Sequence, residues 1–251
     1  MSNKVALVTG GARRIGAAIV RELARGGHAV AVHCNRSRDE AEALADEIAR
    51  SGGRAAVFAA ELRDLAALDR MVEEVGATLG PVTLLVNNAS VFEFDDLASF
   101  GPELWDLHMA VNARAPVHLT KRVAGQAGNF PIAVVNVLDQ KLFNPNPDFL
   151  SYTLSKAALR AATDVLAMAL RPRVRVCAVA PGLTLLSAGQ TEENFARVHG
   201  RTPLGRGSDP EDIAAAVAYL AGPGAATGTV LLVDGGQHMV RSDKDVMFLG
   251  D

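Results

Sequence analysis

The chain has 251 residues, of which 49% are apolar and 5% aromatic, and its formal net charge is −3. This length and composition suit one α/β domain with a single large core. Acidic and basic residues are mixed along the chain, so we expect no nucleic-acid partner and no membrane surface. We find neither an apolar run of about 18 residues nor a charged-then-apolar leader in the sequence, and we therefore expect a cytoplasmic protein.

The two cysteines and the histidines carry no metal or disulfide signal. Cys34 and Cys177 lie far apart in apolar runs, which is typical of buried thiols in a reducing compartment. The histidine spacings match no set of metal ligands, so we predict no metal site.

The first element ends in a glycine-rich turn. Residues 5–8 are an apolar run that predicts a buried strand, residues 9–16 are rich in glycine, and a helix is expected up to about Arg25. Such a turn between strand and helix lets the backbone approach a pyrophosphate at the helix N-terminus. A glycine turn alone is a weak signal, but here a strand precedes it and a helix follows.

The end of the second predicted strand, residues 28–34, indicates which dinucleotide binds. It is followed by Asn35, Arg36 and Ser37, and the first acidic residue is Asp39. An acidic residue here would bind the ribose 2′-hydroxyl of NAD, whereas an arginine suits the 2′-phosphate of NADP. The alternative is a solvated loop arginine. The spacing favours NADP.

The remaining predicted elements alternate between helix and strand. In chain order they are helix 39–51, strand 54–60, helix 64–79 with Asp64 as its cap, strand 82–86, helix 102–126, strand 132–138, a helix from Tyr152 to about Leu170, strand 174–179, helix 208–221 and strand 229–233. Asn112 and Pro116 disfavour a regular helix, so we expect the long helix 102–126 to be kinked. Residues 185–207 are polar and contain glycine, and we predict that they form a mobile lid with a short helix near 192–198.

Seven mostly apolar strands that alternate with helices predict a doubly wound parallel sheet. Ligands of such sheets bind at the carboxyl ends of the strands. Candidate residues gather at these ends, in residues 10–16, 35–37, 87–92, at Asp139 and in residues 181–184. Glu61 and Leu62 follow the third strand, where an adenine ring could rest against Leu62. Phe92 is either a core residue or an aromatic platform in the crevice, and its pattern leaves both open.

Tyr152 and Lys156 are four residues apart in a predicted helix, so their side chains share one face. A nearby cation favours the phenolate, and moving the pKa from about 10 to about 7 takes roughly 4 kcal/mol. Tyr152 would then be a general acid or base near neutral pH. By itself, the pair could also be an ordinary helix face.

Together these motifs resemble the short-chain dehydrogenase/reductase family over essentially the whole chain. The matching motifs are Thr9-Gly10…Ile15-Gly16, Asn87-Asn88-Ala89, Asn112, Tyr152-x-x-x-Lys156 and Pro181-Gly182. The resemblance implies a single-domain Rossmann fold and an NAD(P)-dependent oxidoreductase. Tyr152 would be the proton donor, Lys156 would bind the nicotinamide ribose, and Asn112 would support a proton-relay water. The family is commonly tetrameric, so we expect a homotetramer in which the tail from residue 237 packs on a subunit, near a neighbour's site.

Two positions depart from the family pattern. Arg14 stands where the third glycine of the turn is usual, and Asp139 stands where the catalytic serine is usual. Both changes resemble the pteridine reductases and the dihydromonapterin and dihydrofolate reductases related to them. In that subgroup the arginine contacts phosphate and substrate, and a phenylalanine at the position of Phe92 stacks on the pterin. Ser90 matches the subgroup as well.

The resemblance implies three sets of site residues. The cofactor-binding set is Gly10, Arg13, Arg14, Ile15, Asn35, Arg36, Ser37, Glu61, Leu62, Asn88, Ala89, Ser90, Lys156, Pro181 and Gly182. The substrate set is Arg14, Ser90, Phe92, Asp139 and Tyr152. The catalytic set is Asp139, Tyr152, Lys156 and Asn112.

We therefore expect NADPH-dependent hydride transfer to a C=N bond of a pterin, with the proton supplied through Asp139 and Tyr152. One alternative is a carbonyl or 3-oxoacyl reductase in which Asp139 merely replaces the serine. Another is a non-catalytic NADPH-binding regulator, against which the intact Tyr152, Lys156 and Asn112 argue.

Overall fold

The structure, a computed structural model, describes residues 4–186 and 190–248. Within these residues seven strands form one sheet in the order β3-β2-β1-β4-β5-β6-β7, and all neighbouring strands pair in parallel. The strands are β1 (Val5–Val8), β2 (Ala29–Cys34), β3 (Arg54–Ala59), β4 (Leu84–Asn87), β5 (Ile132–Val137), β6 (Val174–Pro181) and β7 (Val230–Val233). The predicted doubly wound fold is confirmed.

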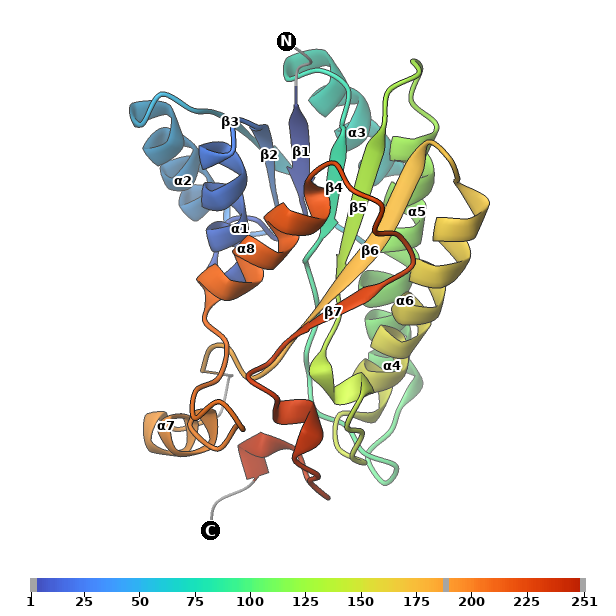
Figure 1. Ribbon diagram of the computed structural model, residues 1–251. Helices are drawn as coiled ribbons and strands as arrows, with labels where there is room; N and C mark the ends of the chain where they lie inside the picture. The colour runs from blue at the N-terminus through green and yellow to red at the C-terminus, as the bar shows by residue number, and fades with distance from the viewer. Residues whose placement is uncertain (1–3, 187–189, 249–251) are drawn as a thin grey trace.

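Helices cover both faces of the sheet (Figure 1). One face carries α1 (Arg14–Arg25), α2 (Arg38–Arg50) and α8 (Pro210–Ala221). The other carries α3 (Leu65–Thr78), α5 (Ala115–Ala124) and α6 (Leu150–Ala169), with α4 (Pro102–His108) beside α6. The short α7 (Glu192–His199) lies apart from both layers, below the sheet in the view of Figure 1.

Strand β1 shows how the two faces form two cores. Its four side chains are fully buried. Because successive side chains of a strand point to opposite faces, Ala6 and Val8 join the core under α1, α2 and α8, while Val5 and Leu7 join the other core. A strand that is covered on both faces must be apolar throughout, and this is why the apolar run at residues 5–8 predicted a buried strand. Burying each of its larger side chains contributes about 1.5–3 kcal/mol.

The predicted helix 102–126 is irregular, as expected, but it is not one helix. A π-helical turn, Met109–Arg114, separates α4 from α5 and carries Asn112. Pro116 lies in the first turn of α5, where its missing N–H costs no hydrogen bond. Single π-helical turns are rare and occur often at functional sites.

The predicted cap of α3 is confirmed, and α8, expected from residue 208, begins at Pro210 after a cap of its own. Asp64 caps α3 by accepting a hydrogen bond from the Ala67 N–H at 3.0 Å. Asp209 and Asp212 form a reciprocal capping box at the start of α8. Both caps satisfy backbone N–H groups that have no partner inside the helix.

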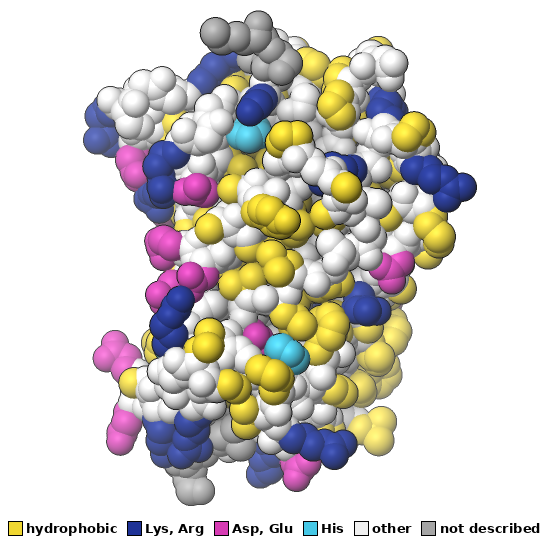
Figure 2. Space-filling view, viewed as in Figure 1, with side chains coloured by type: hydrophobic (Ala, Val, Ile, Leu, Met, Phe, Trp, Pro, Cys, Tyr) yellow, Lys and Arg dark blue, Asp and Glu magenta, His cyan; other side chains and the backbone are white. Residues whose placement is uncertain are grey.

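The carboxyl ends of the strands lie together at the lower edge of Figure 1, beside α7 and the red C-terminal segment. The strand order changes direction between β1 and β4, so the connections leaving these strands go to opposite faces and open a crevice between them. On the face seen in Figure 2, apolar side chains gather over the middle, where α8 and β7 lie, and charges of both signs line the side of α1 and α2. In the described part of the chain, no helix is long and apolar enough to span a membrane.

Candidate active site

A crevice of about 850 Å³ opens at the carboxyl ends of the strands. Nearly every candidate residue from the sequence lines it, although these residues come from segments spread over most of the chain. The lining includes Gly10, Arg13, Arg14, Ile15, Asn35, Arg36, Ser37, Glu61, Leu62, Asn88, Ala89, Ser90, Phe92, Asp139, Tyr152, Lys156, Pro181 and Gly182. Asn112 is the exception among the candidates, since it lies behind the crevice wall.

The glycine turn after β1 is shaped so that the chain can pass close to a ligand. Gly10 has φ +61°, and a Cβ at Gly16 would overlap the carbonyl oxygen of Gly10. Arg14 also has a positive φ, 54°, a conformation that favours glycine. This explains why glycine is usual at that position. The guanidinium of Arg14 donates to the carbonyl oxygen of Leu186 at 3.0 Å, across the crevice. Arg13 is exposed and pairs with Glu40.

His33, which the sequence did not single out, fixes this turn. Its Nδ1 accepts a hydrogen bond from the Gly10 N–H at 3.0 Å, and its Nε2 lies 3.1 Å from the carbonyl oxygen of Ala60. Because Nδ1 accepts, the proton must be on Nε2, which donates to Ala60. Burial lowers the pKa of His33 to about 4, so the imidazole is neutral at physiological pH.

The end of β2 carries a cation in the predicted place. Arg36 is exposed, lines the crevice, and has no hydrogen-bond or ion-pair partner within residues 4–186 and 190–248. Asn35 donates to the carboxylate of Glu61 at 3.2 Å. A guanidinium that is not engaged by the protein is suited to a bidentate contact with a phosphate.

Asn88 joins the end of β4 to the glycine turn. Its side-chain amide donates to the carbonyl oxygens of Thr9 and Gly10 at 2.9 and 3.1 Å. The hydroxyl of Thr9 in turn accepts from the backbone N–H groups of Asn88 and Ala89. These bonds hold the two central strand ends, and therefore the middle of the crevice, at a fixed separation.

Asn112 organises the wall behind the site. Its Nδ2 donates to the carbonyl oxygen of Val91 at 2.9 Å and to Ser155 Oγ at 3.0 Å. Its Oδ1 accepts from Ser90 Oγ at 3.1 Å and from the Val91 N–H at 2.9 Å. The amide therefore bridges the loop after β4 and helix α6. This bridge gives the π-helical turn a structural reason, because the turn carries Asn112.

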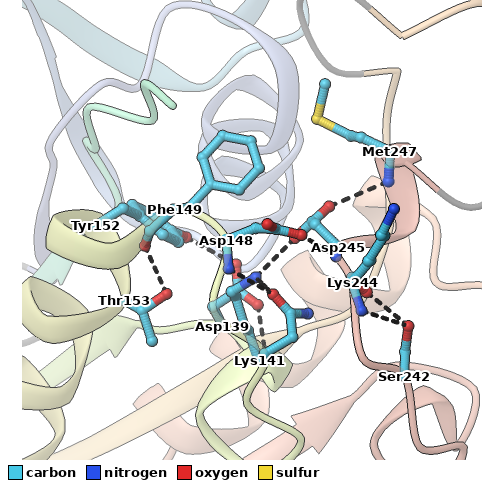
Figure 3. A network of polar contacts seen from close by, with 11 residues as sticks. Asp139, Lys141, Asp148, Phe149, Tyr152, Thr153, Ser242, Lys244, Asp245 and Met247 are labelled. Carbon is cyan, nitrogen blue, oxygen red and sulfur yellow. Dashed lines mark hydrogen bonds and ion pairs between the residues drawn. The ribbon is translucent and has the colours of Figure 1, made fainter. Parts of the chain in front are cut away.

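Asp139, Tyr152 and Lys156 all line the crevice, as predicted, and Figure 3 shows Asp139 beside Tyr152. The Tyr152 hydroxyl donates to Asp139 Oδ2 at 2.7 Å, and the other carboxylate oxygen accepts from the Lys141 N–H at 2.8 Å. Lys156 Nζ donates to the carbonyl oxygen of Val137 at 2.8 Å and lies 5.8 Å from the centre of the Tyr152 ring. Asp139, the second residue after β5, and two residues of α6 thus form one cluster.

The electrostatics of this cluster differ from the expectation for Tyr152. Burial, together with the negative charge of Asp139, raises the pKa of Tyr152 well above its ordinary value, so the predicted lowering toward neutrality is wrong for the protein alone. Burial also raises the pKa of Asp139, in the predicted direction but through loss of water rather than through phosphate. Burial lowers the pKa of Lys156 to about 8, which Asp139 opposes. Asp139 and Tyr152 therefore keep their protons to a higher pH than free side chains would.

Phe92 is not a core residue, and its ring forms an aromatic platform in the crevice. Its side chain is 39% exposed and lines the crevice. The ring stacks on Phe149 with centroids 4.1 Å apart and meets Tyr152 edge-on at 4.7 Å. Aromatic pairs with such geometry contribute roughly 0.5–1.5 kcal/mol beyond the area that they bury. The platform thus packs on Phe149 and stands beside the Asp139–Tyr152 pair.

A buried network holds the loop that carries this platform. His108 Nδ1 lies 2.6 Å from Ser151 Oγ, and His108 Nε2 accepts from the Glu93 N–H at 3.3 Å. Asp95, also buried, accepts from the Ser151 N–H at 3.0 Å. Helices α4 and α6 therefore fix the loop that follows Phe92.

The segment after β6 closes the other side. A Cβ at Gly182 would lie 2.7 Å from that of Asp234, so only glycine lets this turn pack against the end of β7. The predicted lid begins here, and its short helix is confirmed as α7. Residues 187–189 of the lid lie outside the described residues.

The residues present fit a dinucleotide. The turn after β1 would clash with any side chain at Gly16, its backbone leads into the N-terminus of α1, and Arg36 stands where β2 ends. These are the features that receive, in order, a pyrophosphate and a ribose phosphate. Within the described residues no group of histidine, cysteine or acidic side chains could hold a metal ion, and Cys34 and Cys177 are both buried free thiols.

Comparison with known proteins agrees with the fold. A family model described as short chain dehydrogenase matches residues 4–196. An uncharacterised oxidoreductase of Methylorubrum extorquens is 34% identical over 94% of this chain and 98% of its own length. The 3-oxoacyl-[acyl-carrier-protein] reductase FabG of Staphylococcus epidermidis is 31% identical over 94% of this chain and 100% of its own length.

Among solved structures, the FolM alternative dihydrofolate reductase 1 of Brucella suis, in complex with NADP, is 44% identical with a TM-score of 0.92. The alignment covers 96% of this chain and 97% of that one. The angucycline C-6 ketoreductase LanV, with bound NADP, has a TM-score of 0.87 at 32% identity, covering 94% and 96%.

The chain therefore belongs to the short-chain dehydrogenase family. Within the family it is an oxidoreductase that uses NADP and acts on a small molecule.

Proposed function

We propose that this protein is an NADPH-dependent reductase of pteridine-type substrates, which reduces a C=N bond of the pteridine ring. NADPH, when bound, supplies the hydride. The chain's own residues hold the planar substrate and deliver the proton that the ring nitrogen needs. The observation that carries the proposal is the 2.7 Å hydrogen bond between Tyr152 and Asp139 at the crevice floor.

A carboxyl group at position 139, where a serine is usual, changes which class of substrate can be protonated most readily. Burial raises the pKa of Asp139, so that a carboxylic acid can persist at mildly acidic pH and act as a proton source. Tyr152, held against it and also protonated, relays the proton to the crevice. Because the two groups are coupled, the proton belongs to the pair rather than to one residue. A carboxylic acid held in this pair can donate to a ring nitrogen, which takes up a proton during reduction.

The aromatic platform supports the same substrate class. Phe92 presents an exposed ring face beside Tyr152 and is backed by Phe149. A flat heterocycle can stack on such a face. Arg14 and Ser90 also line the crevice, and we propose that they contact polar groups of the substrate and the phosphates. The similarity to the alternative dihydrofolate reductase of Brucella suis supports a folate-like or pterin-like ring.

A substrate comparison tests the proposal. With NADPH in excess, kcat/KM is measured for a dihydropteridine and for a 3-oxoacyl thioester. We expect at least a tenfold preference for the dihydropteridine and inhibition by a pteridine antifolate. The second candidate, a 3-oxoacyl reductase, is favoured by the 31% identity to the staphylococcal enzyme, and a preference for the thioester would establish it instead.

A further inference from the structure

The C-terminal segment lies against its own chain's crevice. We call residues 242–248 the tail segment. It ends in a 3₁₀ turn, Val246–Phe248, that packs beside α7, and Asp245, Val246 and Met247 line the crevice together with Asp139 and Tyr152. Figure 1 shows this red segment returning beneath the sheet. The tail segment thus packs against its own chain, and the expected contact near a neighbour's site stays a prediction.

An ion pair links the tail segment to the loop between Asp139 and Tyr152. Lys141 Nζ lies 2.9 Å from Asp245 Oδ2, and the two side chains are only 3% and 13% exposed. Lys141 also bonds to Asn146, and the Asp245 N–H donates to Asp148 Oδ2 at 2.7 Å. Figure 3 shows these contacts converging between the loop and the tail. All the loop residues lie between Asp139 and Tyr152, so the tail is attached to the segment that carries the proposed proton source.

An aromatic contact continues the attachment toward the substrate platform. Phe248 stacks on Phe149 at 6.1 Å, and Phe94 packs edge-on against both rings, at 5.5 and 5.3 Å. Phe149 is the ring that backs Phe92. The tail segment therefore lies behind the platform as well as along the crevice wall.

These contacts lie apart from the residues that fit the phosphates of a dinucleotide. The glycine turn and Arg36 follow β1 and β2, whereas Lys141 follows β5 and the tail follows β7. In the sheet order these two groups lie on opposite sides of the β1–β4 crossover point.

We propose that the tail segment is the outer wall of the substrate site, and that the Lys141–Asp245 pair holds this wall and the aromatic platform in place. Lys141 and Asp245 are thus positioning residues that determine substrate specificity. For the chemical class of the substrate, the inference rests on the proposed function. A planar ring on Phe92 would have Met247 and Val246 as its outer boundary. Neither Lys141 nor Asp245 need touch the cofactor.

The test compares Asp245→Asn, Lys141→Met and the double variant, with Ser242→Ala as the control. Ser242 is a half-buried tail residue that does not line the crevice, and within the described residues its hydroxyl bonds only to Lys244. We expect each single variant to raise KM for the dihydropteridine about tenfold. The double variant should be no worse than either single one, since the pair acts as a unit. The kcat should stay within threefold, and the Kd of NADPH, from its fluorescence, within twofold.

An unchanged KM in Asp245→Asn and Lys141→Met would overturn the inference, as would a Kd of NADPH that rises together with KM. Amide hydrogen exchange without substrate gives a second readout. Residues 146–152 should exchange at least tenfold faster in Asp245→Asn than in wild type, and equal exchange would contradict the attachment. If wild type reduces no pteridine, the proposed function fails, and the same variants are compared on the carbonyl compound that it does reduce.

Discussion

Asp139 and Tyr152 show how burial decides what a titratable pair can do. The helical spacing of Tyr152 and Lys156 suggested that the ammonium would lower the phenol's pKa. In the structure, Lys156 Nζ is directed to the carbonyl oxygen of Val137, while the Tyr152 hydroxyl faces a carboxyl group. Both burial and the carboxylate raise the pKa of Tyr152. A sequence displays the spacing, but which neighbour each polar atom faces depends on side-chain directions that only the packed fold sets.

At the same scale, Arg36 should select NADP over NAD. Hydrogen bonds to charged groups contribute about 1.5–3 kcal/mol each, so we expect Arg36→Asp to lower kcat/KM with NADPH roughly 10- to 100-fold and to improve the use of NADH. The measurement is steady-state kinetics with both cofactors. Arg38→Ala is the matched control, because Arg38 is two residues away and already pairs with Glu42 at 2.8 Å. A similar loss in both variants would argue against a specific phosphate contact.

At the scale of elements, His33 couples three of them. It lies in β2, accepts from the glycine turn after β1, and donates to the residue after β3. The sequence shows a histidine within an apolar run, which is compatible with any buried polar partner. The partners themselves come from neighbouring strands, so only the strand order and register reveal them.

This coupling predicts an acid sensitivity of the fold. The pKa of His33 is lowered to about 4, so between pH 6.5 and 4 the unfolded chain binds a proton that the folded chain refuses. The free energy of unfolding must therefore fall as the pH falls through this window, by up to roughly 3 kcal/mol from this residue. His33→Gln can make both hydrogen bonds without titrating. Urea unfolding at pH 7 and pH 4.5 should show a loss smaller by about 2–3 kcal/mol in the variant, and equal losses would contradict this role.

The elements themselves were largely predictable, because apolar runs and helical periodicity are local. The strand boundaries differ by a residue or two, as in β6, which extends to Pro181 instead of ending at Val179. The helix around Asn112 was harder to predict from the sequence. A poor helix former and a proline indicated a distortion, but a π-helical turn depends on Asn112 reaching Val91 and Ser155, which are remote in sequence.

For the whole molecule, the parallel sheet is what makes the site predictable. Because every strand ends at the same edge, residues that follow separate strands must meet there. This is how Arg36 and Asp139 could be assigned to one crevice. The positions of Phe149, Lys141 and Asp245 at the crevice were not predictable, because sheet topology does not fix where a long loop or a C-terminal tail lies. Movement of the lid and assembly into a tetramer stay predictions.

The central claim is that the Asp139–Tyr152 pair supplies the proton of the reaction. Its most direct test is kcat/KM for a dihydropteridine against pH, in wild type and in Asp139→Asn. Since the pKa of Asp139 is raised, the wild-type rate should be highest at mildly acidic pH and fall as the acid form is lost with rising pH. The variant should be about 100-fold slower and should lose this fall. Two profiles that fall at the same pH with similar height would contradict the account.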